Sequence, residues 1–465
     1  MAKLWDKGTD LDAQIERFTV GEDTVLDRAL IEADVFGSIA HAEMLSGIGV
    51  LTEEEFRSLR KALLEIFQES QSGDFQIKRE DEDVHTAVEN ALTRKLGDLG
   101  KKIHAARSRN DQVLVDTRIY TRARLLSVET ELLKLTETLT NFADAHKQVP
   151  MPGRTHTQRA MPSSVGLWAG AFAESLLDDL ELIKTVYHLN NQCPLGSAAS
   201  YGVPLPIDRR RTSDLLGFDR VQNNVLYANN SRGKIEAMAL FALSQVTEDL
   251  SKLSNDLILF SIPEFGYFAL PEEHCPGSSI MPQKRNPDPL ELVRAKSAGV
   301  VSRLLRMIMI VRNLPSGYNR DFQETKKPLM EALDTTESCL KVVRLIFGRV
   351  RVNPDVLVKS FTPELFAADE ALRLVTEGMP FRDAYQEVAK RLDALKTEDP
   401  VANIRSRTHL GAPGNLGLDH VRTRIESEVR RIEQEEVRLA KVRERLMKRE
   451  EEQGSGAREN VKREA

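Results

Sequence analysis

The longest stretch without a helix breaker is the feature that most constrains this fold. Between Gly100 and Pro150 the chain contains neither glycine nor proline, and Asn110 or Asp111 can cap the start of a helix there. Apolar residues recur at helical spacing along the stretch: Val115, Ile119, Leu126, Leu133 and Phe142. The pattern predicts one helix of about 36 residues, roughly 54 Å long at about 1.5 Å per residue.

Four further long helical patterns follow, at residues 163–191, 231–260, 288–313 and 328–347. Each ends at a helix-stopping residue: Pro194, Pro263, Pro315 and Gly348. With little strand signal, five long helices predict an all-α fold built on a bundle. Residues 165–182 are more apolar than a helix with a single buried face requires. We therefore expect oligomerisation to bury further faces of the bundle helices.

The patterns divide the chain into three predicted helical domains, at residues 1–107, 108–358 and 359–465. The first contains a helix at 52–71 that starts with a capping box between Thr52 and Glu55. Residues 422–452 mix both charges with apolar residues near heptad spacing, which favours a solvated helix or coiled coil over a polyanion-binding surface. Residues 453–465 are predicted to be disordered.

The amino-acid composition limits the kinds of partner that the protein is expected to bind. The chain has 465 residues, 41% hydrophobic, and a net charge of −6, which gives no general basic surface for nucleic acid or a membrane. The sparse cysteines Cys193, Cys275 and Cys339 argue against a disulfide framework, and the amino terminus lacks a signal-peptide pattern. We therefore predict a cytoplasmic protein with a small-molecule substrate.

No cofactor pattern is present in the sequence. It has no phosphate-binding loop, no dinucleotide fingerprint and no CxxC pair. His274 beside Cys275 does not make a complete zinc site. Chemistry without a cofactor or metal is predicted.

Residues 277–288, GSSIMPQKRNPD, gather several anion-handling groups just before a long helical pattern. Gly277 permits an unusual backbone path, and the serines offer hydroxyl and N–H groups. Lys284 offers a point charge, and Asn286 offers an amide that can form two hydrogen bonds. This composition predicts a catalytic loop for a carboxylate-rich substrate.

The same segment resembles the signature of the fumarase/aspartase superfamily, whose members release fumarate by β-elimination. Three other segments resemble blocks of the argininosuccinate lyase family in the same order: SRNDQ at 108–112, THTQRA at 155–160 and YNRDFQE at 318–324. The resemblance implies reversible cleavage of argininosuccinate to arginine and fumarate in arginine biosynthesis. It also implies a homotetramer with a central helical bundle and active sites shared between subunits.

The resemblance assigns the catalytic roles to four residues. Ser278 matches the base and His156 the group with the opposite proton-transfer role, although the two roles are open to exchange. A serine base needs nearby positive charge, for which Lys284 and the loop N–H groups are candidates. The usual pKa of histidine, about 6.5, suits His156 to proton transfer near neutrality. Glu291 matches the acidic residue that orients the histidine across a subunit boundary.

By the same resemblance, Ser108, Asn110 and Thr155 anchor the second carboxylate of the succinyl group. Tyr318, Gln323 and Lys326 match contacts to the arginine portion. Three further expected substrate-binding positions lie in the same blocks: Arg109, Gln283 and Asn286. His85 lies in another segment that resembles a family block, EDVHT at 82–86. For His85 a structural hydrogen-bonding role and direct substrate contact both remain open.

Two positions depart from the family pattern and affect which amine the protein is expected to release. Thr325 stands where the family often has aspartate, and Asp23 stands where an amino-terminal block has serine. Release of fumarate from another N-succinyl amine or aminocarboxylic acid is therefore the alternative. A non-catalytic structural protein on the same fold is the alternative from another class.

Overall fold

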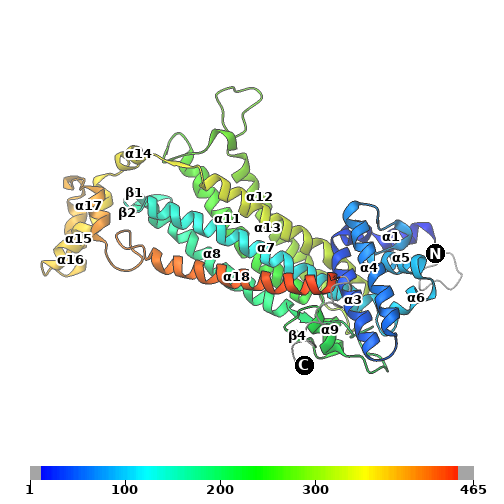
Figure 1. The fold of residues 1–465 in the computed structure, drawn as a ribbon. Helices are drawn as coiled ribbons and strands as arrows, with labels where there is room; N and C mark the ends of the chain where they lie inside the picture. The colour runs from blue at the N-terminus through cyan, green and yellow to red at the C-terminus, as the bar shows by residue number, and fades with distance from the viewer. Residues whose placement is uncertain (1–11, 449–465) are drawn as a thin grey trace, which may run out of the picture.

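The computed structural model describes residues 12–448 and confirms the all-α prediction (Figure 1). Five long helices form the central bundle: α7 (Arg109–Ala145), α8 (Val165–Asn190), α11 (Lys234–Ser261), α12 (Asp288–Val311) and α13 (Lys326–Phe347). Their apolar faces share one buried core, whose residues run in sequence from Leu125 to Ile432. None of the helices described has the length and apolar character needed to cross a membrane.

Helix α7 spans 37 residues, and its N-cap lies two or three residues before the proposed caps. Its N-cap is Ser108, whose Oγ accepts a hydrogen bond from Asn110 N at 3.3 Å. Asp111 completes a capping box because its Oδ1 accepts from Ser108 N at 2.8 Å. The prediction that Asn110 or Asp111 is the cap is therefore wrong, because Asp111 works from the third helical position.

The other bundle helices begin and end within three residues of the predicted bounds. At α8, Ser164 caps the first turn by accepting from Leu167 N at 3.0 Å. Pro328 lies in the first turn of α13, where a missing N–H costs no helical hydrogen bond. Two short helices occupy the chain between α8 and α11: α9 (Arg209–Leu215) and α10 (Val225–Asn230).

The amino-terminal part packs a second core at one end of the bundle (Figure 1). Its helices are α1 (Ala13–Val20), α2 (Asp23–Leu26), α3 (Ile31–Gly47), α4 (Glu53–Ser72), α5 (Val84–Leu96) and α6 (Asp98–Lys101). The capping box predicted at Thr52 is confirmed: its Oγ1 accepts from Glu55 N, and its own N–H donates to Glu55 Oε2.

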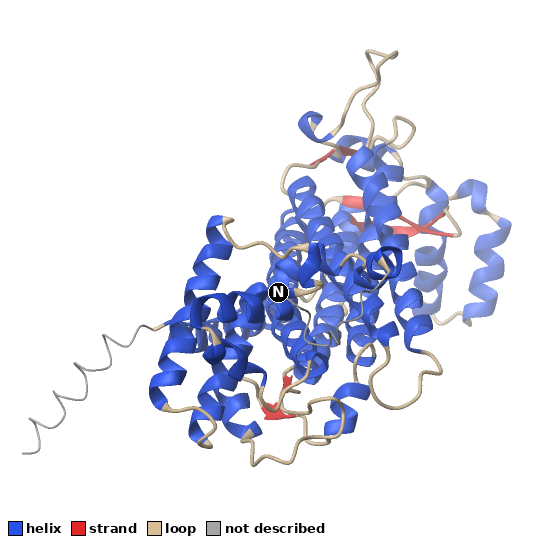
Figure 2. Ribbon diagram, turned by 90° about the vertical axis from the view of Figure 1, so that its right-hand side faces the viewer, coloured by secondary structure: helices blue, strands red, loops and turns tan. Residues whose placement is uncertain are grey.

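The strands are short and form three two-stranded sheets (Figure 2). They are β1 (Pro150–Thr155), β2 (Gln158–Ser164), β3 (Gln192–Cys193), β4 (Arg220–Val221), β5 (Phe268–Ala269) and β6 (Arg351–Val352). Strands β1 and β2 form an antiparallel hairpin between α7 and α8, which the sequence patterns did not predict. This hairpin lies at the opposite end of the bundle from α1–α6 (Figure 1).

The carboxyl-terminal part begins at that opposite end and then returns along the bundle (Figure 1). Its helices are α14 (Pro354–Lys359), α15 (Ala367–Thr376), α16 (Phe381–Lys390), α17 (Pro400–Ser406) and α18 (Leu418–Met447). Ile425 and Ile432 of α18 are buried in the bundle core, and Leu446 is buried in the amino-terminal core. The predicted charged helix exists, but its apolar face is buried on the bundle rather than solvated. The disorder predicted for residues 453–465 lies outside the described residues.

One ion pair links α18 to α7. Glu129 is fully buried on α7, and its Oε2 lies 2.5 Å from Arg431 Nη2. Burial raises the pKa of Glu129 to about 7, while Arg431 acts to lower it. The buried carboxylate of Glu129 therefore depends on Arg431 for its counter-charge.

We expect Arg431→Met to lower the free energy of unfolding by about 3 kcal/mol, because it leaves Glu129 buried without its counter-charge. Denaturant titration at fixed protein concentration measures the loss. Glu129→Gln in the same chain should restore most of it, whereas Arg430→Met, at an exposed surface pair on the same helix, should change little. An Arg431→Met protein as stable as the wild type would contradict the role given to this pair.

Candidate active site

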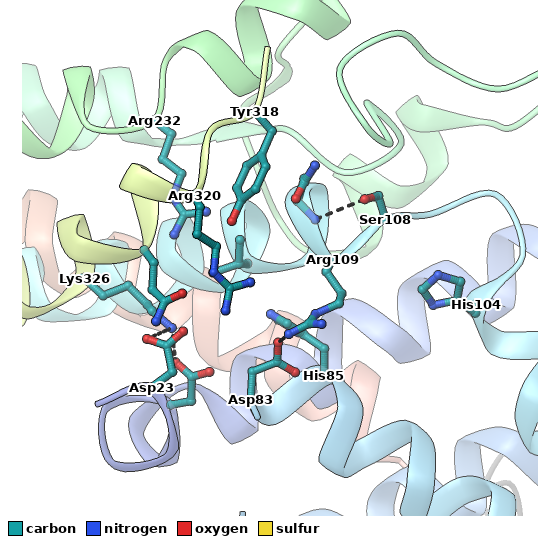
Figure 3. A pocket seen from close by; sticks show the side chains of 14 residues that line it. Asp23, Asp83, His85, His104, Ser108, Arg109, Arg232, Tyr318, Arg320 and Lys326 are labelled. Carbon is teal, nitrogen blue, oxygen red and sulfur yellow. Dashed lines mark hydrogen bonds and ion pairs between the residues drawn. The ribbon is translucent and has the colours of Figure 1, made fainter. Parts of the chain in front are cut away.

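A pocket of about 480 Å³ lies where the amino terminus of α7 meets α2, α5 and the start of α13 (Figure 3). It brings together seven of the predicted site residues: His85, Ser108, Arg109, Asn110, Tyr318, Gln323 and Lys326. Its other lining residues are Asp23, Asp27, Asp83, His104, Val113, Arg232 and Arg320. Segments that are more than 200 residues apart in the sequence therefore converge on one polar cavity.

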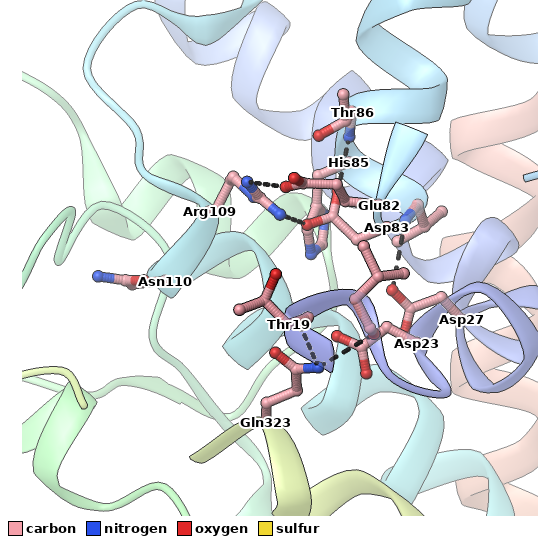
Figure 4. A network of polar contacts seen from close by, with 12 residues as sticks. Thr19, Asp23, Asp27, Glu82, Asp83, His85, Thr86, Arg109, Asn110 and Gln323 are labelled. Atoms are coloured by element: carbon pink, nitrogen blue, oxygen red, sulfur yellow. Dashed lines mark hydrogen bonds and ion pairs between the residues drawn. The ribbon is translucent and has the colours of Figure 1, made fainter. Parts of the chain in front are cut away.

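The wall beside α5 is held by Arg109. Its guanidinium pairs with Asp83 and lies 3.2 Å from Glu82 Oε2 (Figure 4). Asp83 also caps α5, because its Oδ1 accepts from Thr86 N at 2.9 Å. The predicted substrate contact Arg109 is thus already matched by two carboxylates and fixes α5 against the start of α7.

Lys326 is buried at the floor of the pocket. Its Nζ lies 2.8 Å from Asp23 Oδ1 and 2.5 Å from Asp27 Oδ1. Burial raises the pKa of Asp23, while Lys326 acts to lower it. Asp23, a residue that departs from the family pattern, therefore serves as a second counter-ion to the lysine expected to contact the arginine portion.

Gln323 bridges the pocket and α1. Its Nε2 donates to Thr19 O at 3.0 Å and to Val20 O at 3.1 Å (Figure 4). With both amide hydrogens used, Oε1 remains as an acceptor, which suits a guanidinium donor. The hydroxyl of Tyr318 offers a second polar group from the same loop (Figure 3).

A buried polar layer lies beneath the pocket. His85 Nδ1 is 2.9 Å from Asp34 Oδ1 and 3.5 Å from Asp116 Oδ2. Burial raises the pKa of Asp116 well above its usual range, and the carboxylates of Asp34 and Asp27 raise it further. His85 thus has the structural hydrogen bond considered for it and also borders the pocket.

The ligand atoms of Asp34, His85 and Asp116 lie within 4.8 Å of one another, as those of metal ligands do. Among residues 12–448 they are the one such set of acidic, histidine and cysteine side chains. The nearby positive charges of Arg107 and Lys326 act on Asp116 and already offset part of its negative charge. Burial is the largest cause of the raised Asp116 pKa, and the carboxylate of Asp34 adds to it, because a second negative charge in this buried layer is costly.

His156, the histidine predicted to transfer a proton, lies on a different surface from the pocket. Thr155 ends β1, and His156 and Thr157 form the exposed turn of the hairpin with φ of 52° and 61°. Arg154 Nη1 donates to Thr157 O at 2.8 Å, which braces this left-handed turn. Within the described residues the His156 ring has no hydrogen bond or ion pair, so its imidazole is available to another molecule.

The predicted catalytic loop projects from the bundle ahead of α12 (Figure 1). A bridge between Gly277 and Arg285 closes its base. Ser278 Oγ accepts from Ile280 N at 3.3 Å and from Met281 N at 3.1 Å. Two donors aimed at one hydroxyl oxygen stabilise negative charge there, which is what a serine base requires. Both donors are N–H groups of the 277–288 loop.

The other residues predicted for this loop follow Ser278 along the chain. Gln283 and Lys284 are exposed, and Asn286 N donates to Pro276 O at 3.0 Å. Glu291 is exposed on the first turn of α12. Over the described part of the chain, no ion pair or hydrogen bond connects Glu291 to His156.

Two arginines of the pocket were not predicted as site residues. Arg320 belongs to a segment already singled out, and its Nη2 donates to Thr19 O at 2.8 Å. Arg232 lies between α10 and α11, in a stretch that sequence patterns treated as the start of a helix. Its only local signal is the Arg-Gly pair at 232–233, since Gly233 adopts φ of 79° and marks a turn.

The comparisons decide the family. A family model described as lyase matches residues 10–302. Argininosuccinate lyase from Thermotoga neapolitana is 46% identical over 389 residues, which cover 84% of this chain and 98% of that one. Argininosuccinate lyase from Phocaeicola vulgatus is 45% identical over 92% of this chain and 95% of its own. The chain belongs to the argininosuccinate lyase family.

Solved structures share the fold of this lyase. EDDS lyase in complex with formate superposes with a TM-score of 0.79 at 22% identity, covering 94% of this chain and 95% of that one. Class II fumarase from Schistosoma mansoni gives 0.68 at 16% identity, covering 83% and 94%. The bundle is thus the fumarase/aspartase architecture.

The raised pKa of Asp116 predicts a pH-dependent stability. Above its unfolded-state value of 3.8, the folded protein must either keep this carboxyl protonated or ionise it while buried, so the residue costs more stability as pH rises. We therefore expect Asp116→Asn to unfold at a higher temperature than the wild type at pH 8, with a smaller difference at pH 5. Thermal unfolding across this range measures it, and parallel curves for the two proteins would contradict the assignment.

Proposed function

We propose that this family member is an argininosuccinate lyase that reversibly cleaves argininosuccinate to arginine and fumarate in arginine biosynthesis. The supporting observation is the convergence of positions from three family blocks on one pocket, in a chain more than 40% identical to argininosuccinate lyases along most of its length. The pocket contains acceptors for a guanidinium and cations for carboxylates.

The reaction needs groups that this pocket lacks. A base removes the proton from the carbon next to a succinyl carboxylate, the electron pair forms the double bond of fumarate, and the C–N bond breaks. The leaving nitrogen then takes a proton. Ser278 and His156 supply these two transfers in either order, while Lys284 and Asn286 stabilise the charge that develops on the carboxylate.

The length of α7 supports the sharing of sites between subunits. Ser108 starts this helix, and Thr155 and His156 lie just beyond its end. A 37-residue helix is roughly 55 Å long, so the two ends of one chain cannot contact the same small molecule. We propose a homotetramer in which the pocket of one subunit receives the hairpin and the 277–288 loop of others.

Exposed apolar side chains on the bundle support this assembly. They lie on three helices that would otherwise present them to water: Phe241 on α11, Leu292, Leu305, Ile308 and Met309 on α12, and Leu345 on α13. Burial of such a surface between subunits would also fix the relative placement of the loops. Chemistry without a cofactor and a cytoplasmic location remain part of the proposal.

A related lyase acting on another N-succinyl amine is the second candidate. The observation in its favour is Asp23. Its carboxylate forms an ion pair with Lys326 and so changes the charge next to the expected amine-binding residues. Both candidates use the same elimination and differ in the leaving amine.

Purified protein should release fumarate from argininosuccinate, detected by ultraviolet absorbance. Adenylosuccinate, aspartate, malate and other N-succinyl amines form the comparison panel. Turnover of argininosuccinate alone supports the proposal, while preferred turnover of another N-succinyl amine supports the second candidate. Ser278→Ala should lower kcat by about 10³ or more, because a proton-transfer group is lost, without changing the oligomer.

Shared sites predict complementation. His156→Ala and Ser278→Ala proteins should each be nearly inactive, but mixed oligomers formed after mild dissociation should regain activity because some sites then contain both residues. Native mass spectrometry verifies subunit exchange. Proven exchange with no recovered activity would argue that each site is built within one chain.

A further inference from the structure

Asn230, the last residue of α10, holds the segment that carries Tyr318. Its Oδ1 accepts a hydrogen bond from Gly317 N at 2.8 Å, and its Nδ2 donates to Ser316 Oγ at 3.3 Å. One amide side chain therefore bonds two consecutive residues that lie 86 and 87 positions further along the chain. The next residue is Tyr318, whose side chain points into the pocket (Figure 3).

The backbone before Tyr318 is fixed, whereas its hydroxyl is left for a ligand. Gly317 has φ of 95°, which glycine adopts without strain, and its carbonyl accepts from Asn319 Nδ2 at 3.3 Å. The Tyr318 ring lies 6.2 Å from that of Phe322, centroid to centroid. Within residues 12–448 the Tyr318 hydroxyl forms no hydrogen bond. Its direction is therefore set by the path of the segment that Asn230 holds.

Asn230 is itself held on both sides. Asn229 is buried, and its Nδ2 donates to Ser197 Oγ at 3.1 Å. Ser231 is also buried, and its Oγ accepts from Arg118 Nη2 at 2.9 Å. These bonds fix the backbone on either side of Asn230. Its amide is thus presented to the 316–317 segment in one orientation, before any ligand enters the pocket.

We propose that Asn230 is a positioning residue for Tyr318. By holding Ser316 and Gly317 it directs the Tyr318 hydroxyl toward the amino-acid portion of the substrate, and so sets the affinity for that portion without moving a proton. The inference rests on the proposed function and deepens it, because Tyr318 is expected to contact the arginine portion. Asn230 does not line the pocket itself, so it acts through the segment that it bonds.

Asn230→Ala removes both hydrogen bonds. We expect its KM for argininosuccinate to rise about 5- to 10-fold, as for the loss of one well-placed neutral hydrogen bond, with kcat within about 2-fold. Asn230→Asp keeps an acceptor for Gly317 N and should stay near the wild-type KM. Asn223→Ala is the matched control and should keep wild-type values, because Asn223 is exposed and its side chain forms no hydrogen bond within the described residues.

A double-mutant cycle with Tyr318→Phe separates positioning from a general loss of structure. If Asn230 acts through the Tyr318 hydroxyl, Asn230→Ala adds little to the KM of the Tyr318→Phe protein, and the two changes are not additive. Additive losses, a wild-type KM in Asn230→Ala, or an equal loss in Asn230→Asp would each overturn the role given to Asn230.

A fluorinated tyrosine at position 318 tests the same role without turnover. Asn230→Ala should shift the fluorine NMR signal of the intact protein, whereas Asn223→Ala should not. Ser316→Ala removes one of the two bonds and provides the comparison if Asn230→Ala does not fold. A wild-type protein that releases no fumarate from argininosuccinate would count against the proposed function. An unchanged fluorine signal in Asn230→Ala would count against the positioning of Tyr318.

Discussion

Asp111 fixes where the longest helix begins, and the placement of every candidate site group follows from that point. One carboxylate oxygen accepts from Ser108 N, and the other accepts from Gly196 N and Ala198 N. The carboxylate is fully buried, and burial raises its pKa even though three backbone donors act to lower it. The start of α7 is thereby joined to the loop after α8. The rigid length of α7 then sets the distance from the pocket to the His156 hairpin, which is the basis of the proposed sharing of sites between subunits.

The pocket is built mainly from charges that neutralise one another. Asp83 and Glu82 hold Arg109, while Asp23 and Asp27 hold Lys326. Such pairs keep their geometry when the cavity is empty, because moving either member away would leave the other charge buried without a partner. A pocket organised in this way is preformed for its substrate.

Helix bounds were predictable because their signals are local. Thr52 and Pro328 act through residues within one turn, and the apolar spacing of 163–191 reports its own burial. The hairpin at 150–164 was missed because its pairing joins a turn of two residues with φ above zero, neither of which is glycine. Ionic partners were missed for another reason: Lys326 and Asp27 are about 300 residues apart in sequence, and no local pattern reports such a contact.

The two departures from the family pattern act on the same feature of the pocket. Thr325 is buried, donates from Oγ1 to Phe322 O, and its methyl lies close to Gly233. A neutral side chain there adds no negative charge next to Arg232. Asp23 instead adds its charge at Lys326, 2.8 Å away. Together the two departures place a carboxylate at Asp23, where both Lys326 and Arg232 act to lower its pKa, and a neutral side chain at Thr325.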